Sequence, residues 1–177
     1  LFGQYDYSLE DLNSTSDYYQ EFVGTSFFPD QVTIHYFGHY NWGTCTARFG
    51  QLDDLYQNLL ESGYDKVKLI GVGKSQHMNY LSNWTSNNYA SVCADASGNQ
   101  IWNTWGANQR DLFVLDHEGN IELYQNITGG LPNNLESLII NLVNQIPECA
   151  EGEINNDNPC NPMECVEGQW IEIIIDC

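Results

Sequence analysis

Cysteine offers this chain its widest choice of chemistry, because a thiol can serve as a nucleophile, a metal ligand or half of a disulfide. Cys45 lies near the start of an expected helix, where it could act as the nucleophile of a one-cysteine peroxidase or thiol exchanger. The alternative is a disulfide, with Cys93 as the expected partner, and the even number of six cysteines favours it. We therefore expect disulfides at all six positions, which are Cys45, Cys93, Cys149, Cys160, Cys165 and Cys177.

Histidine is the second candidate for chemistry. His35 and His39 are four residues apart, so both lie on one side of the chain if it stays extended. Together with Cys45 or His77 they could form a copper or zinc site, since imidazole and thiolate ligands suit both metals. Histidines on a strand and in the loop after it more often pack or form hydrogen bonds, and we favour that interpretation. We accordingly expect no metal and no other cofactor.

Three Asn-X-Ser/Thr triplets are candidate N-glycosylation sites, at Asn13, Asn83 and Asn126. A chain this rich in asparagine contains such triplets by chance, but all three lie in polar, turn-like segments. The chain also starts at Leu1 rather than Met, which we interpret as a mature chain after removal of a signal peptide. Together with the six cysteines, these features predict a secreted, extracellular glycoprotein.

Charge excludes several classes of partner. Five Lys+Arg stand against 24 Asp+Glu, and the formal net charge is −19. Nucleic acids bind proteins through Lys and Arg that displace counterions, so they are excluded, as are anionic membrane surfaces. No apolar run approaches the roughly 18 residues that a membrane span requires. With 42% hydrophobic and 13% aromatic residues, the chain still has ample material for a folded core.

Hydrophobic periodicity predicts the elements that must position these residues. Residues 32–37 predict a buried strand, residues 49–60 an amphipathic helix, and residues 67–72 a second strand. This strand–helix–strand unit implies parallel strands with a right-handed crossover. Two further strands, at 111–116 and 121–125, predict an antiparallel hairpin, and residues 131–146 predict a helix that Pro147 ends.

This order of elements is that of the thioredoxin-like fold, an α/β fold with a central mixed sheet flanked by helices. Two segments also resemble one family that has this fold, the N-terminal domain of selenoprotein P, a secreted member of the thioredoxin-like superfamily. The segments read HYNWGTCTARFGQLDDLYQNLLESGYDKVKLIGVG and QIWNTWGANQRDLFVLDHEGNIELY. The similarity covers residues 30–146 and implies a thioredoxin-like fold with Cys45 in its redox loop.

The redox loop departs from that family at one position. The family carries a selenocysteine or cysteine three residues before the position of Cys45, and this chain has Trp42 there. An exchange cycle within one protein needs an attacking thiolate and a resolving thiol one helical turn later. With Cys45 alone this cycle cannot run, so the resemblance implies a degenerate redox motif.

The C-terminal tail ends in an apolar segment that we expect to be a strand. Residues 148–168 are acidic. We expect this tail to be cross-linked by disulfides among Cys149, Cys160, Cys165 and Cys177. An unpaired apolar strand promotes aggregation, so it must pair, either with the chain's own sheet or with a neighbouring subunit. Its five large apolar residues are the candidates for self-association: Trp170, Ile171, Ile173, Ile174 and Ile175.

We therefore expect an N-terminal arm at 1–30, a thioredoxin-like domain at 31–147 and a Cys-rich acidic tail at 148–177. The preferred function is a secreted acidic glycoprotein whose redox-inactive domain is a structural and self-assembly module without enzymatic activity. Its expected partners are N-linked glycans and further copies of the chain, in a homo-oligomer or filament. The alternative is an extracellular thiol–disulfide oxidoreductase or peroxidase that uses Cys45. A further alternative is an extracellular metal-binding protein.

Overall fold

Segments that are far apart in the sequence form the main sheet. The computed structural model describes residues 5–157 and 161–174, which divide into a main unit, Leu1–Val143, and a tail unit, Asn144–Cys177. Within the described residues the main sheet has five strands, in the order β5-β4-β3-β6-β7. Their bounds are β3 (Val32–Phe37), β4 (Val67–Lys74), β5 (Ser91–Asp95), β6 (Asp111–Leu115) and β7 (Ile121–Asn126).

Strand directions confirm the predicted mixed sheet. β3, β4 and β5 run parallel, whereas β6 is antiparallel to β3 and β7 is antiparallel to β6. β3 has the predicted bounds, and all six of its residues are buried, as a central strand requires. The sequence interpretation did not include β5, which is short and follows a polar Asn/Ser-rich stretch.

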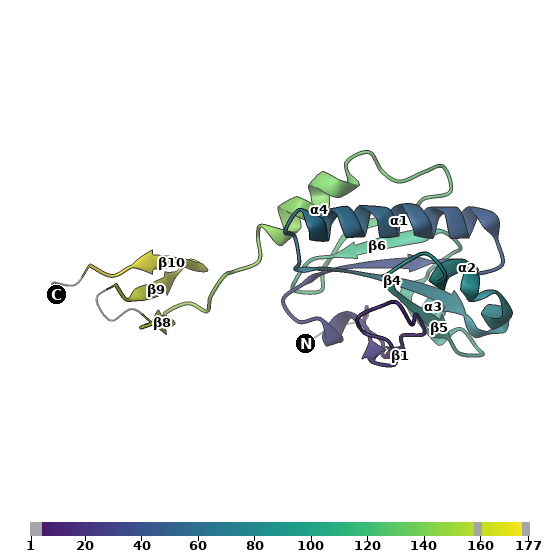
Figure 1. Cartoon of the computed structure of the whole chain (residues 1–177), viewed down its shortest axis with the longest axis horizontal. Coiled ribbons are helices and arrows are strands. Elements are labelled where there is room, and N and C mark those ends of the chain that lie inside the picture. Colours follow the sequence, from purple (N-terminus) through teal and green to yellow (C-terminus); the bar gives the residue numbers. More distant parts are fainter. Residues whose placement is uncertain (1–4, 158–160, 175–177) are drawn as a thin grey trace. The chain divides into compact units, whose positions relative to one another are not determined.

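Two helices, α1 (Gly43–Glu61) and α4 (Leu135–Val143), cover one face of this sheet (Figure 1). Buried residues recur along α1 at helical spacing, with Phe49, Leu52, Tyr56 and Leu59 all facing inward. The ring of Phe49 stacks on the ring of Trp84, with 4.5 Å between the centroids. Trp84 lies in the short helix α2 (Ser82–Thr85), which follows the 3-10 helix η2 (Ser75–Tyr80). α1 ends where Gly63 takes up a positive φ of 88°, a conformation that glycine adopts at little cost.

The N-terminal segment and α3 (Gln100–Trp105) cover the opposite face of the sheet. In this segment β1 (Leu9–Glu10) pairs with β2 (Phe22–Val23), ahead of the 3-10 helix η1 (Thr25–Phe27). Aromatic and aliphatic side chains from both coverings pack into one core with the sheet: Tyr7, Val23, Phe28, Phe37, Ile70, Val72, Cys93, Trp102, Trp105, Phe113 and Leu115.

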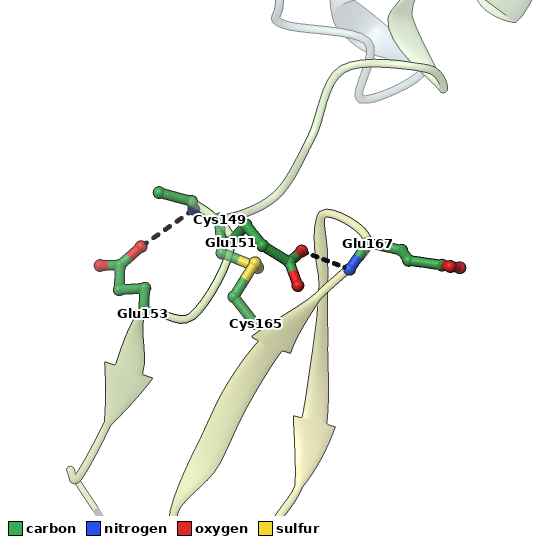
Figure 2. Close-up of a disulfide and its surroundings, with 6 residues drawn as sticks. Cys149, Glu151, Glu153, Cys165 and Glu167 are labelled. Atoms are coloured by element: carbon green, nitrogen blue, oxygen red, sulfur yellow. Dashed lines mark hydrogen bonds between the residues drawn. A yellow bond between two sulfur atoms is a disulfide. The ribbon is translucent and has the colours of Figure 1, made fainter.

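The described part of the tail unit contains a small antiparallel sheet of β8 (Ile154–Asn155), β9 (Met163–Val166) and β10 (Gln169–Glu172). A disulfide joins Cys149 to Cys165 on β9, with 5.8 Å between the Cα atoms (Figure 2). Glu167 and Gly168 both have positive φ, of 53° and 77°, which is typical of the tight turns that join antiparallel strands.

The apolar C-terminal strand pairs within its own chain, with β9 of the small tail sheet and not with the main sheet as one of the two expectations had it. β10 ends at Glu172, and Ile175 lies outside the described residues. Self-association through Trp170, Ile171, Ile173 and Ile174 stays a prediction. No helix among the described residues is long and apolar enough to cross a membrane.

Candidate functional site

Cys45 is the third residue of α1, immediately after the loop that follows β3. Trp42 precedes the helix, and its carbonyl oxygen accepts the first-turn hydrogen bond from the backbone N–H of Thr46, at 3.0 Å. In the described part of the chain the thiol of Cys45 is free, and the residue has no exposed surface. The fold therefore places a buried thiol at the N-terminal end of a 19-residue helix, where the backbone dipole favours negative charge.

Two side chains from the loop before β6 donate hydrogen bonds to the sulfur of Cys45. Nε2 of Gln109 lies 3.5 Å from Sγ, and Nη1 of Arg110 lies 3.9 Å from it. The Arg110 backbone is fixed on both sides, because its N–H donates to Phe37 O and its carbonyl accepts from Ile127 N–H. Cationic and N–H donors at a helix N-terminus are typical of cysteines that do redox chemistry.

A second arginine lies beside the same site. Arg48, one helical turn after Cys45, donates from Nε to Ile127 O at 2.8 Å and from Nη2 to Thr128 O at 3.0 Å. Arg110 donates from Nε to Thr128 Oγ1 at 2.7 Å. Thr128 thus joins the two guanidinium groups, one through its carbonyl and one through its hydroxyl.

Tyr36 contacts the first turn of α1 through its hydroxyl group. Its hydroxyl donates to the backbone carbonyl of Cys45 at 3.3 Å. Burial raises the pKa of Tyr36 far above its ordinary value, and Cys45 adds to this, while Arg110 and Arg48 oppose it. The phenol therefore stays protonated and acts as a hydrogen-bond donor.

His39 lies in the loop before α1 among other rings. Its centroid is 4.9 Å from His77, 5.6 Å from Trp42 and 5.5 Å from Trp102. The pKa of His39 is lowered to about 4, mainly by burial and in smaller part by the electrostatic effects of His77, Lys74 and Arg110. The imidazole is neutral at physiological pH, and its surroundings are rich in cationic groups.

The less favoured alternative, a metal site that combines His35 and His39, does not match the arrangement of these two side chains. His35 is fully buried on β3, where Tyr7 Oη lies 2.7 Å from its Nδ1 and Trp105 packs against it at 4.7 Å. His39 packs instead against Trp102, at the end of the strand. Among the described residues no three His, Cys, Asp or Glu side chains come together as a metal site.

The expected Cys45–Cys93 disulfide is also wrong, since both thiols are free in the described residues. Cys93 lies on β5 with its side chain in the core under the N-terminal segment, where Sγ is 3.7 Å from Leu9 O. Cys45 belongs to α1 on the other face, so the sheet separates the two sulfurs. Burial raises the pKa of Cys93 well above its ordinary value. Cys149 and Cys165 form one of the bridges expected in the tail, and Cys160 and Cys177 lie outside the described residues.

Glycosylation of Asn13 is contradicted by its position in the fold. Asn13 is fully buried, and its side-chain amide donates to Asn88 O at 2.9 Å and to Ala90 O at 2.8 Å. Because the whole side chain is enclosed by the fold, no glycan fits there. Asn83 and Asn126 are exposed and stay predictions.

Sequence reasoning missed Arg48, Gln109 and Arg110 as site residues. The available signal was their rarity and position: the chain has only two arginines, and Arg48 follows Cys45 by three residues. Gln109 and Arg110 are more than 60 residues away, and only the pairing of β6 with β3 brings them to Cys45.

The main unit has the fold of known disulfide oxidoreductases. No family model and no curated protein matches the sequence. A secreted Mycobacterium tuberculosis disulfide oxidoreductase, described as homologous to E. coli DsbE, shares 14% identity over 80% of this chain and 96% of its own, with a TM-score of 0.55. The thioredoxin domain of a thiol-disulfide oxidoreductase from Bacteroides vulgatus shares 12% over 78% and 93%, with a TM-score of 0.58.

A further solved structure is that of a thioredoxin-like protein from Bacteroides vulgatus, with 16% identity over 78% of this chain and 85% of its own and a TM-score of 0.61. At these identities the similarity shows the fold, which is thioredoxin-like, as predicted. The comparisons contradict the expectation of a redox-inactive structural and self-assembly module, because proteins that share the fold are disulfide oxidoreductases. Cys45, which that expectation placed in a disulfide, is free.

Proposed function

We propose that this protein is a secreted thiol–disulfide oxidoreductase that uses Cys45 as its redox-active cysteine. The observation that carries the proposal is the free thiol of Cys45 at the N-terminus of α1, with Gln109 and Arg110 donating to its sulfur. The activities of the proteins that share the fold support it.

The reaction must proceed with one protein thiol, because Trp42 occupies the place of a second one. The Cys45 thiolate attacks one sulfur of a substrate disulfide; an S–S bond to Cys45 forms, the substrate's S–S bond breaks, and its other half leaves and takes up a proton. A second, external thiol then attacks this mixed disulfide and releases Cys45. One disulfide and one thiol enter, and one disulfide and one thiol leave.

Access to the sulfur sets the size of the substrate. Cys45 has no exposed surface, whereas Trp42 beside it is 48% exposed. Gln109 and Arg110, which are part-buried against Sγ, must shift before a disulfide reaches it. Small disulfides therefore react faster than folded proteins with buried ones.

An extracellular location suits both the proposed exchange chemistry and the rest of the chain. The Cys149–Cys165 disulfide supports it, because such bonds persist in oxidising environments. Asn83 would then be available for an N-linked glycan at an exposed position, whereas Asn126 is exposed but its amide donates to Gln109 O and to Asp111 Oδ1 and would have to be released first. Loss of mass on treatment of the secreted protein with a glycosidase tests that part of the proposal.

Turnover of a small disulfide tests the function. The purified full chain is mixed with an aryl disulfide and an excess of a monothiol, and the exchange rate is compared among wild type, Cys45→Ser and Cys93→Ala. We expect Cys45→Ser to fall to the uncatalysed rate, because it removes the sulfur nucleophile. Cys93→Ala should keep the wild-type rate, since Cys93 lies on the other face of the sheet. A Cys45→Ser variant with full turnover contradicts the proposal.

A further inference from the structure

The few cations of this acidic chain are concentrated around Cys45. The chain has five Lys+Arg against 24 Asp+Glu, and both of its arginines lie at this site. Arg110 reaches the sulfur itself, and Arg48 and Arg110 both bind Thr128. Lys74, a third cation, lies 4.2 Å from the ring of Trp102, which packs against His39.

The partners that the structure describes for the two guanidinium groups are uncharged. Arg48 donates to two backbone carbonyls and to Gln51 Oε1, at 2.8 Å, and Arg110 donates to a hydroxyl and to the Cys45 sulfur. No carboxylate is among these partners, and the Cys45 thiolate of the proposed reaction would offset at most one of the two positive charges. The nearest acid in sequence, Asp111, is engaged elsewhere, by Asn126 Nδ2 at 2.7 Å and Tyr124 Oη at 3.0 Å.

Such a site favours an anion over a neutral molecule. A guanidinium group has five N–H donors and binds carboxylates with a planar pair of hydrogen bonds. The described bonds use three of these donors in Arg48 and two in Arg110. Because the rest of the surface repels anions, a carboxylate ligand would be attracted to this site in preference to others.

We propose that the substrate of Cys45 is a small disulfide or thiol that carries carboxylate groups, held by Arg110 and Arg48 while its sulfur meets Sγ of Cys45. This inference rests on the proposed function. The sulfur chemistry is the exchange already described, and the arginines contribute binding and orientation of the anionic half that becomes attached to Cys45.

Two aryl disulfides of similar size separate charge from reactivity. One is 5,5′-dithiobis(2-nitrobenzoate), which carries two carboxylates, and the other is 4,4′-dithiodipyridine, which is neutral at pH 8. The rate of mixed-disulfide formation at Cys45 is measured on the full chain from release of the coloured thiol. Peptide mapping assigns the reaction to Cys45, and the rate of the Cys45→Ser variant is subtracted.

Arg110→Gln is expected to slow the reaction with the carboxylate probe about tenfold, because the variant loses one charge-assisted hydrogen bond to the probe. The reaction with the neutral probe should slow too, because Arg110 donates to Sγ of Cys45, but by a smaller factor, since charge pairing with the probe is absent there. Arg48→Gln separates charge from thiol reactivity, because the described bonds of Arg48 go to Ile127 O, Gln51 Oε1 and Thr128 O and not to the sulfur: it should slow the carboxylate probe and change the neutral probe less than about twofold. Lys66→Gln is the matched control: it removes one exposed cation beside the start of β4, away from Cys45, and should alter neither rate.

Each outcome decides between the proposals. If the arginine variants lose rate equally with both probes, the proposal of an anionic substrate is overturned and the thiol chemistry is unaffected. The same holds if Lys66→Gln slows the carboxylate probe as much as the arginine variants do. Absence of any reaction of Cys45 with either probe overturns the proposed function itself. If Arg110→Gln does not fold, Arg48→Gln carries the test with the same two probes, and a loss that is equal for both contradicts the inference.

Discussion

The environment of Cys45 is assembled from three segments that meet only in the folded chain. The first turn of α1 supplies the thiol and Arg48, the loop before β6 supplies Gln109 and Arg110, and Thr128 joins the two arginines. Sequence alone could locate the thiol, because a strand, a loop and a helix follow one another there. It could not decide whether Cys45 and Cys93 form a disulfide, because the local sequence does not show on which face of the main sheet each sulfur lies.

His35 shows how a buried polar residue ties stability to pH. Burial lowers the pKa of His35 from an ordinary 6.5 to about 3, so the unfolded chain binds a proton that the folded chain does not. The stability contributed by neutral His35 is complete above about pH 6.5 and is lost as pH falls toward about 3, at about 1.4 kcal/mol per pH unit.

Comparison of wild type with His35→Phe isolates this contribution. The variant lacks the titrating group, so its free energy of unfolding should depend less on pH between about 6.5 and 3, whatever constant loss follows from leaving the Tyr7 hydroxyl without its partner. Denaturant unfolding at several pH values measures both slopes. Parallel pH profiles for the two proteins would show that His35 does not titrate as described.

α1 positions the thiol, and a buried carboxylate holds α1 in place. Asp53 accepts hydrogen bonds from the backbone N–H groups of Tyr89 and Ala90, at 3.0 and 2.7 Å, and so ties the helix to the loop before β5. Burial raises the pKa of Asp53, and these two N–H groups lower it.

Asp53→Ala should lower the free energy of unfolding by about 2 kcal/mol, because it leaves two buried N–H groups without their acceptor. The neighbouring Asp54 is exposed and serves as the control, and Asp54→Ala should change stability by less than about 0.5 kcal/mol. Denaturant titration of both variants makes the comparison. Equal losses would mean that the helix–loop connection contributes little.

Periodic segments were the elements that could be predicted. β3, β4, α1, β6, β7 and α4 all carry regular apolar spacing, and the structure contains each of them. α1 starts earlier than its periodicity indicates, at Gly43, because its first turn packs through Cys45 rather than through large apolar residues. β5 and α3 lack such spacing, and their positions depend on pairing with β4 and on packing of Trp102 and Trp105 against the sheet.

Charge distribution relates the whole chain to its proposed chemistry. The net charge of −19 predicts that polyanions are repelled, and the acidic tail contributes to this charge with no cation after Val143. Against this background the two arginines at Cys45 are an exception. The tail unit has its own stabilising link in the Cys149–Cys165 disulfide, and every contact described for Cys45 comes from the main unit.

Thiol mapping of the native, unreduced full chain tests the central claim most directly. The protein is treated with a small neutral thiol reagent under non-denaturing conditions, digested without reductant and analysed by mass spectrometry. The account predicts that Cys45 is modified while Cys149 and Cys165 are recovered as a linked peptide pair. Recovery of Cys45 in a disulfide with another cysteine of the chain, or unmodified after prolonged treatment, would contradict it.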